Sequence, residues 1–318
     1  MFVFALITGM TNFAGADVSD IKIGVLANRG TEHCMEEWKP TADYLTQMIQ
    51  GKTFVIVPLD FEQIYDAVKK ADIDFILANP VLYVELEALY KVSRIATLKN
   101  KVFNKAYTEY GSVVFTKKNR DDIQDYKDLK GKNYMAVHKT SLGGWLMAWR
   151  EFKQAGVDPF KDFASINFGQ THDAVVYAVR DGKVDAGNVR TDTLERMQAE
   201  DKIQVADFKA IHEHGGEKVH LPFVHSTRSY PERPLAKLLH TPIGLAEMVV
   251  KALLAMPPDS AAAQAAKIAG WTIPLNYQDV HACLKELKVG PYKDIGKITA
   301  QAIFKKYWIL ILIYIVIL

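Results

Sequence analysis

One short stretch of the chain, residues 139–145 (KTSLGGW), combines residue types that favour anion binding. Thr140 and Ser141 are preferred N-cap residues, and Gly143 and Gly144 allow a ligand to approach the backbone closely. A helix that begins here would direct unpaired N–H groups and the positive end of its dipole at a ligand, and Lys139 adds a formal positive charge. The stretch therefore predicts an oxyanion site. A capped helix whose glycines serve only packing is the alternative.

Candidate ligand contacts also lie at strand ends in the first third of the chain. The sequence predicts strands over residues 21–26 and 74–78, which Arg29 and Asn79 follow, and Tyr83 lies one turn into the next helix. Since ligands of open parallel sheets bind outside the carboxyl ends of the strands, we expect these side chains to face one crevice. Arg29 is the most informative, because a guanidinium can hold an oxyanion through two parallel hydrogen bonds. A solvated Arg29 and a Tyr83 that only packs are the alternatives.

A second group of candidates follows the anion-favouring stretch. His172 ends the loop 169–172 after a predicted strand over 165–168, and Arg190 lies near the end of a predicted strand over 184–191. Ser226 and Thr227 belong to a proline-bounded segment, 221–231, that suits a chain crossing between two lobes. These residues would offer donors to the ligand from the opposite side.

Strand and helix patterns alternate through most of the 318 residues, of which 49% are apolar. Three strand–helix units within residues 21–89 predict a parallel sheet with right-handed crossovers. The charged stretch 117–122 and the segment 221–231 mark two chain crossings. The chain is therefore predicted to be an α/β protein of two lobes that close on a ligand, the type II periplasmic-binding-protein (Venus-flytrap) fold. The first lobe would comprise residues 21–110 and 228–300, and the second residues 111–227.

Both ends of the chain carry patterns typical of membrane targeting. Residues 2–10 are apolar and precede AGA at 14–16, which predicts a signal peptide over residues 1–16; an uncleaved anchor is the alternative, since no basic n-region is present. Residues 307–318 are apolar without interruption, which predicts the start of a transmembrane helix over 305–318, since a span needs roughly 20 residues. A buried C-terminal strand is the alternative. The two patterns predict an exported, membrane-anchored domain, and the family resemblance given below implies a periplasmic domain anchored in the bacterial inner membrane.

Several functional classes are not expected. A net charge of +2 without a concentrated basic face argues against nucleic acid as a partner. His212, His214, His220 and His225 lack the spacing and the cysteine partners of zinc sites, so no metal is expected. Nucleophile elbows, zincin pairs, Walker loops and histidine-kinase motifs are all absent from the sequence, so we expect no catalytic site and no cofactor in this segment.

Three further side chains bear on ligand chemistry. Cys34 and Cys283 are the only cysteines, and the sequence leaves open whether they are free or bridged. Cys34 lies near the crevice and a helix start, where a thiolate is favoured, so it is a candidate redox-active contact; a buried or bridged cysteine is the alternative. Asp185 is a candidate acceptor for the hydrogen of a protonated ligand.

Segments from both lobes also carry a family resemblance: IGVLANRG (23–30), WKPTADYL (38–45), DFILANP (74–80), SLGGW (141–145), VDAG (184–187), VRTD (189–192) and STRSYPE (226–232). With these segments the chain resembles the phosphate- and phosphonate-binding family of periplasmic proteins, and more closely the sensor domains of tetrathionate-type sensor histidine kinases. The resemblance covers residues 21–242. After YPE such sensors carry a tryptophan, where this chain has Arg233.

The resemblance implies a ligand-sensing domain that binds a small oxyanion, such as tetrathionate, between its lobes. It further implies a following transmembrane helix and a cytoplasmic histidine kinase, which would act as a homodimer and phosphorylate a response regulator. The alternative that it leaves open is the phosphate- or phosphonate-binding component of an ABC importer.

Overall fold

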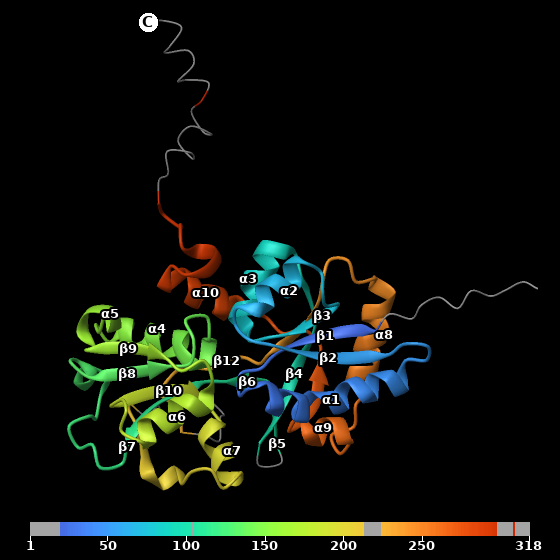
Figure 1. Ribbon diagram of the computed structural model, residues 1–318. Helices are drawn as coiled ribbons and strands as arrows, with labels where there is room; N and C mark the ends of the chain where they lie inside the picture. Colours follow the sequence, from blue (N-terminus) through green and yellow to red (C-terminus); the bar gives the residue numbers. More distant parts are fainter. Residues whose placement is uncertain (1–19, 103–104, 213–223, 298–307, 309–318) are drawn as a thin grey trace, which may run out of the picture.

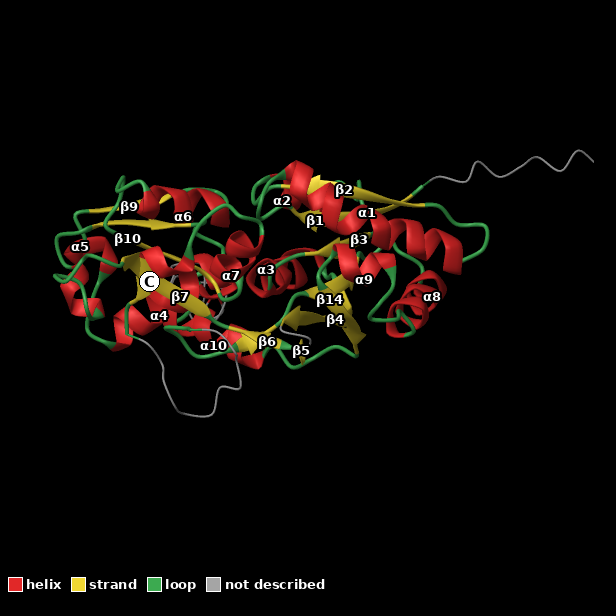
Figure 2. Cartoon of the chain, turned by 90° about the horizontal axis from the view of Figure 1, so that it is seen from below, coloured by secondary structure: helices red, strands yellow, loops and turns green. Residues whose placement is uncertain are grey.

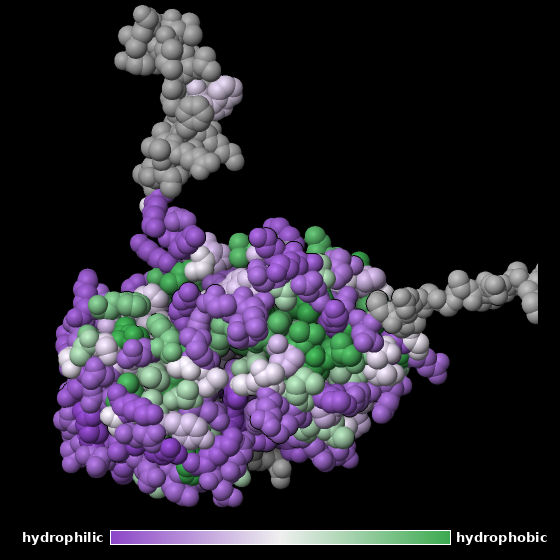
Figure 3. Space-filling view, in the orientation of Figure 1, coloured by the Kyte–Doolittle hydropathy of each residue, from purple (hydrophilic) through white to green (hydrophobic). Residues whose placement is uncertain are grey.

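The computed structural model describes residues 20–102, 105–212, 224–297 and 308, which form two α/β lobes lying side by side (Figure 1). Figure 2 shows the same two lobes from below, with the connecting segments between them. Hydrophilic side chains cover most of the face seen in Figure 3, including the boundary between the lobes. The arrangement confirms the predicted two-lobed fold.

The first lobe is built on a seven-stranded sheet with the order β14-β4-β13-β3-β1-β2, and β5 pairs with β4 at its margin. Strands β1, β2 and β3 are parallel, whereas β13 and β14 run antiparallel to their neighbours. The strands are β1 (Ile21–Leu26), β2 (Phe54–Leu59), β3 (Phe75–Leu77), β4 (Ser93–Val102), β5 (Lys105–Tyr107), β13 (Pro234–Lys237) and β14 (Ile268–Thr272).

Helices cover both faces of this sheet because successive strand residues point to opposite sides. Phe75 and Leu77 pack in the core beneath α1 (Thr31–Met48), α8 (Ile243–Leu254) and α9 (Ala261–Ala265). Ile76, between them, belongs to the core that includes α2 (Gln63–Lys69) and α3 (Pro80–Tyr90). A capping box lies at the start of α2, where Gln63 N–H donates to Asp60 at 2.7 Å and Asp60 N–H donates to the Gln63 side chain at 3.1 Å.

The second lobe has a five-stranded sheet with the order β11-β7-β10-β8-β9. Its strands are β7 (Ser112–Lys117), β8 (Asn133–Ala136), β9 (Ser165–Phe168), β10 (Ala186–Arg190) and β11 (Phe208–Ala210). Its helices are α4 (Met147–Gln154), α5 (Pro159–Asp162), α6 (His172–Arg180) and α7 (Thr193–Ala199), with a π-helical turn at Leu142–Leu146 and 3-10 turns at Tyr126–Leu129 and Val205–Asp207. The sheet directs the carboxyl ends of β8 and β10 toward the first lobe.

The lobes are joined by the short strands β6 (Glu109–Tyr110) and β12 (Tyr230–Pro231), which pair with each other. The last described helix, α10 (Gln278–Leu287), packs against α3 of the first lobe and α4 of the second, and a 3-10 turn at Gly290–Tyr292 follows it. Helix α9 ends at Ala265, because Lys267 has a left-handed backbone (φ 53°) and the chain then pairs with β4 as β14.

Within the described ranges, we find no helix that combines the length and the apolar composition needed to cross a bilayer. The predicted signal peptide (1–16) and membrane helix (305–318) fall outside those ranges, apart from Trp308.

Candidate ligand cleft between the lobes

Two adjoining cavities, here called chamber A and chamber B, lie between the lobes. Both are lined by Asn28, His172, Arg190 and Arg233. Chamber A is completed by Leu26, Phe61, Asn79, Tyr110, Ser141 and Gly143, and chamber B by Arg29, Glu37, Asn100, Asp192, Thr193, Arg196 and Ala266. Their free volumes are about 20 and 30 Å³, which is room for one or two water molecules each. The lobes are therefore closed, and a larger ligand requires them to open.

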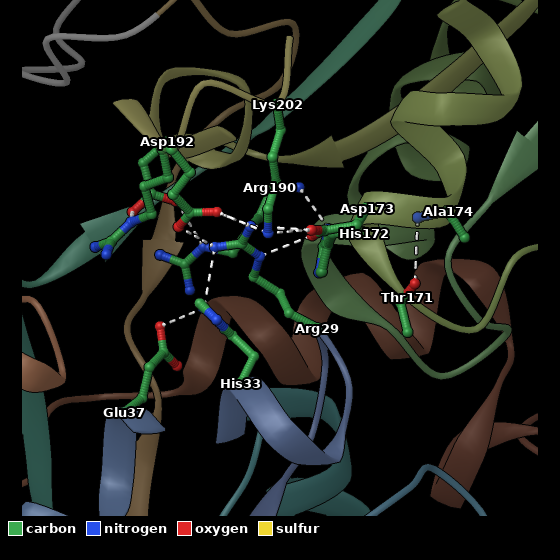
Figure 4. Close-up of polar contacts among 12 residues, drawn as sticks. Arg29, His33, Glu37, Thr171, His172, Asp173, Ala174, Arg190, Asp192 and Lys202 are labelled. Atoms are coloured by element: carbon green, nitrogen blue, oxygen red, sulfur yellow. Dashed lines mark hydrogen bonds and ion pairs between the residues drawn. The ribbon is translucent and has the colours of Figure 1, made fainter. Parts of the chain in front are cut away.

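Arg29 holds the lobes together rather than presenting a free guanidinium. It extends from the loop after β1 toward α6 of the other lobe (Figure 4). Its Nε donates to Asp173 at 2.7 Å and its Nη2 to Glu200 at 2.7 Å, while Lys202 and Lys267 also pair with Glu200 at 3.1 and 2.9 Å. Burial alone would lower the pKa of Arg29, but its hydrogen bonds to Glu200 and Asp173 raise it overall. Arg29 is thus the centre of an interlobe ion network.

Arg190 enters the cleft from the end of β10 with most of its donors already engaged. Its Nη2 donates to Glu232 at 2.6 Å and its Nε to Asp192 at 3.1 Å, and its guanidinium lies 4.4 Å from the centre of the Tyr110 ring. Burial acts to lower the pKa of Arg190, but the charges of Asp192 and Glu232 raise it. The side chain provides a fixed positive wall shared by both chambers.

His172, at the start of α6, is a buried neutral donor. The backbone N–H of Arg190 donates to its Nδ1 at 3.4 Å, so the ring proton is on Nε2. Burial and the charge of Arg190 lower the pKa of His172 to about 3. The imidazole therefore stays uncharged at neutral pH and keeps an N–H group for the cleft.

Arg233 is one of several cleft residues that sequence reasoning did not place among the ligand contacts. Its guanidinium lies 5.6 Å from the centre of the Trp38 ring and lines both chambers, and its buried Nε lacks a hydrogen-bond partner among the described residues. Burial and the neighbouring Arg190 lower the pKa of Arg233. A buried donor without a partner is costly unless a ligand or water accepts from it. The departure from the family pattern at this position was its only signal in the sequence.

The anion-favouring stretch forms the wall of chamber A opposite the first lobe. Ser141 caps the π-helical turn, since Gly144 N–H donates to its Oγ at 3.1 Å. A Cβ at Gly143 would lie 2.8 Å from both Arg190 Cβ and Tyr110 Cε2. Glycine is therefore needed at position 143 for close packing, as the alternative of a capped helix with packing glycines predicted. The same packing brings the N-terminus of the π-helical turn to chamber A.

Asn79, Thr140 and Lys139, three other predicted ligand contacts, lie where the two lobes meet. Asn79 caps α3 through its Oδ1, and its Nδ2 donates to the Thr140 carbonyl of the other lobe at 3.3 Å. The Thr140 hydroxyl pairs with His138 Nδ1 at 2.9 Å. Lys139 is exposed and lies 3.7 Å from Glu62 of the first lobe, outside both chamber linings. Thr140 and Lys139 thus lie beside the cleft.

Three predicted contacts lie away from the chambers. The Tyr83 hydroxyl donates to Glu87 and accepts from Arg94 at 3.0 Å, so it packs beside its own helix instead of facing the crevice. Ser226 and Thr227 accept from backbone N–H groups of β7 at 2.9 and 3.0 Å. Their hydroxyls fix the returning chain against β7, because a buried N–H group needs a partner.

The structure agrees with the buried alternative for Cys34 rather than with a redox contact at the cleft. Cys34 is buried against β1, and burial raises its pKa to about 12. Cys283 is buried in the other core cluster, and burial raises its pKa to about 12 as well. Both are free thiols. Each therefore stays protonated at neutral pH.

Two other expectations concern Asp185 and metals. Asp185 pairs with Arg120 at 2.6 Å and lines neither chamber. Of the clustered histidines, His214 and His220 fall outside the described residues. Within the part of the chain that the structure describes, no group of three or more His, Cys, Asp or Glu could hold a metal ion.

Comparison with known proteins identifies the family of the chain. Residues 23–278 match the family described as ABC transporter, phosphonate, periplasmic substrate-binding protein. The chain is 32% identical over 278 residues to the tetrathionate sensor histidine kinase TtrS of Salmonella typhimurium, covering 87% of this chain and 45% of that protein. It therefore spans less than half of this curated relative.

Solved structures show the same fold. PhnD1 from Prochlorococcus marinus in complex with methylphosphonate has a TM-score of 0.70 at 15% identity, covering 84% of this chain and 98% of that one. A binding-protein component of an ABC phosphonate transporter from Pseudomonas aeruginosa has a TM-score of 0.68 at 15% identity, covering 92% and 95%. With the match over residues 23–278, they show that this chain belongs to the family of phosphonate-type periplasmic substrate-binding proteins.

Proposed function

We propose that the chain is the extracytoplasmic ligand-sensing domain of a membrane-bound two-component sensor histidine kinase. In this proposal a small oxyanion, tetrathionate or a related sulfur compound, binds between a first lobe of residues 21–110 and 228–300 and a second lobe of residues 111–227. The observation that carries it is the buried Arg233 guanidinium, whose Nε lacks a partner among the described residues and which lines both chambers. The likeness to TtrS over 87% of the chain supports the sensor role.

Charge in the cleft favours an anion. Of the described lining residues, four are arginines. Arg29 is paired with Asp173 and Glu200, Arg190 with Glu232 and Asp192, and Arg196 with Asp192. The Nε of Arg233 is left without a partner among the described residues, so an anion would complete its pairing.

Helix α10 offers a route for the signal, because it contacts both lobes. Its Glu286 accepts from Arg150 of α4 at 2.6 Å and from Gln154 at 2.9 Å. At the beginning of α10, the Tyr277 hydroxyl donates to the carbonyl of Glu232, next to β12, at 2.7 Å. A change in the angle between the lobes must therefore move α10 relative to one of them, and the C-terminal segment would pass this shift to a membrane helix.

For the whole protein, we infer a membrane anchor, a kinase module, a homodimer and a cognate response regulator. These rest on the likeness to TtrS, of which the chain covers 45%. The second candidate is the phosphate- or phosphonate-binding component of an ABC importer, which the family match favours.

The test is titration calorimetry of the purified protein with tetrathionate, thiosulfate, sulfate, phosphate and methylphosphonate. Arg233→Met should weaken binding of the preferred anion roughly 10- to 100-fold, as expected for loss of a charge-assisted hydrogen bond. Arg180→Met is the matched control, since Arg180 pairs with Asp181 on the surface of the second lobe. Tight binding of methylphosphonate alone would favour the importer. An unchanged affinity in Arg233→Met would contradict the proposed site.

A further inference from the structure

Chamber A lacks a carboxylate among its described lining residues, although the cleft as a whole is rich in ion pairs. Its lining consists of apolar and aromatic side chains, polar uncharged groups and the two arginines Arg190 and Arg233. An acid O–H group that moves from water into the chamber needs a hydrogen-bond acceptor there. The composition of the lining therefore affects whether the chamber binds protonated or only fully ionised oxyanions.

The side-chain acceptors of chamber A are occupied by backbone N–H groups. Asn79 Oδ1 accepts from Val81 and Leu82 at 2.9 and 3.2 Å. His172 Nδ1 accepts from a backbone N–H at 3.4 Å, and Ser141 Oγ accepts from one at 3.1 Å. These three groups can offer a ligand little besides their remaining N–H or O–H donors.

The other polar lining groups are also donors or can serve as donors. Arg233 Nε is buried and without a partner among the described residues. Burial keeps the pKa of Tyr110 well above its usual range, so its hydroxyl stays protonated. The π-helical turn after Ser141 begins with N–H groups that have no partner within the turn. Asn28 alone adds an uncharged amide that can accept as well as donate.

The carboxylates of chamber B lie outside the lining of chamber A and already have partners. Asp192 receives hydrogen bonds from Arg190, Arg196 and Asn100 at 3.1, 2.9 and 2.7 Å. Glu37 pairs with His33 at 3.1 Å. An acid hydrogen in chamber A would therefore have to compete with an existing ion pair.

We propose that chamber A selects fully ionised oxyanions, such as sulfate, sulfonates and the thiosulfonate ends of polythionates, over oxyanions that carry an acid hydrogen, such as hydrogen phosphate and hydrogen phosphonates. This inference rests on the proposed anion-binding function and names its ligand class. A site in which donors outnumber free acceptors satisfies every oxygen of a sulfate-type anion. The P–OH group of hydrogen phosphate loses its water acceptor there, which weakens binding roughly 10- to 100-fold.

The experiment uses three tetrahedral dianions of similar size in a slightly alkaline buffer: sulfate, monofluorophosphate and hydrogen phosphate. Only hydrogen phosphate carries an acid hydrogen. Sulfate controls for the double negative charge, and monofluorophosphate controls for the phosphorus atom. We expect calorimetric titration to give similar affinities for sulfate and monofluorophosphate, with hydrogen phosphate weaker by roughly 10- to 100-fold.

A pair of variants tests the cause. Ser141→Asp keeps a good N-cap and adds a carboxylate acceptor to the chamber wall, whereas Ser141→Asn keeps the cap without the charge. The ratio of phosphate to sulfate affinity should rise at least about tenfold in Ser141→Asp relative to Ser141→Asn. Equal affinities for the three anions in the unaltered protein would overturn this inference and leave the proposed anion site standing. Failure of all three anions and of tetrathionate to bind would overturn both.

Discussion

Arg29 is predicted to hold the lobes closed without ligand. Its four hydrogen bonds to Asp173 and Glu200, of 2.7 to 3.0 Å, cross the cleft, and the side chains of the three residues are only 8%, 15% and 19% exposed. Arg29→Met would leave two carboxylates facing the cleft. Removing one partner of a buried pair costs about 3–5 kcal/mol. Because Lys202 and Lys267 still pair with Glu200, we expect about 2–3 kcal/mol, a roughly 30- to 150-fold shift toward the open form.

The assay measures the separation of the lobes directly. Spin labels on Lys39→Cys in α1 and Lys161→Cys in α5 would report it, since these side chains are 62% and 81% exposed. The native Cys34 and Cys283 are buried, so the labels should be specific. Electron–electron distance measurements should show one short distance in the parent protein and a dominant longer one in Arg29→Met.

A double-mutant cycle tests whether the pairing of Arg29 with Glu200 holds the lobes closed. Glu200→Gln should have a smaller effect in Arg29→Met than in the parent protein, because the interaction is already lost. Arg120→Met is the control, as Arg120 pairs with Asp122 and Asp185 within the second lobe. Refutation would be an unchanged distance distribution in Arg29→Met, or additive effects of the two substitutions.

Four further outcomes are expected. The pKa of His172 is lowered to about 3 by burial and a neighbouring guanidinium, so between about pH 6.5 and 3 the unfolded chain binds a proton that the folded chain does not, and stability falls with falling pH. His172→Gln should flatten the decline of melting temperature over this range; an unchanged slope would contradict this. Gly143→Ala should cost about 1–3 kcal/mol in urea unfolding, because its Cβ would meet atoms at 2.8 Å, whereas Gly244→Ala, with open space around it, should not destabilise; equal effects would refute the close packing. Cys34→Ser should leave the tetrathionate affinity measured by calorimetry unchanged, since the pKa of the buried thiol is raised to about 12, and loss of binding would restore the redox hypothesis. Glu286→Gln should leave that affinity unchanged and reduce the ligand response of autophosphorylation in the whole kinase; an unaltered response would exclude this contact from the signal route.

The sequence was sufficient for most local elements and for the two-lobed architecture, although the crossing expected at 117–122 lies at β6, since β7 already pairs in the sheet of the second lobe. Strands at Ile21–Leu26 and Ser165–Phe168 have the predicted limits, because apolar runs and flanking breakers are local signals. The cap at Ser141 and the capping box of Asp60 and Gln63 are also local, since each involves residues three positions apart. These signals, together with the family resemblance, gave the fold and the family.

Only the tertiary structure decided what the arginines do. Arg29 was predicted to bind the ligand, but its partners Asp173 and Glu200 are 144 and 171 positions away, a pairing that no local pattern encodes. In the sequence, Arg233 was only a departure from a family pattern. It became a candidate ligand contact because its Nε is buried and has no hydrogen-bond partner among the described residues. The residue types therefore predicted an anion site rich in hydrogen-bond donors. Which of these donors remain for a ligand was decided by long-range pairing, because an arginine forms an ion pair with whichever carboxylate the fold places beside it.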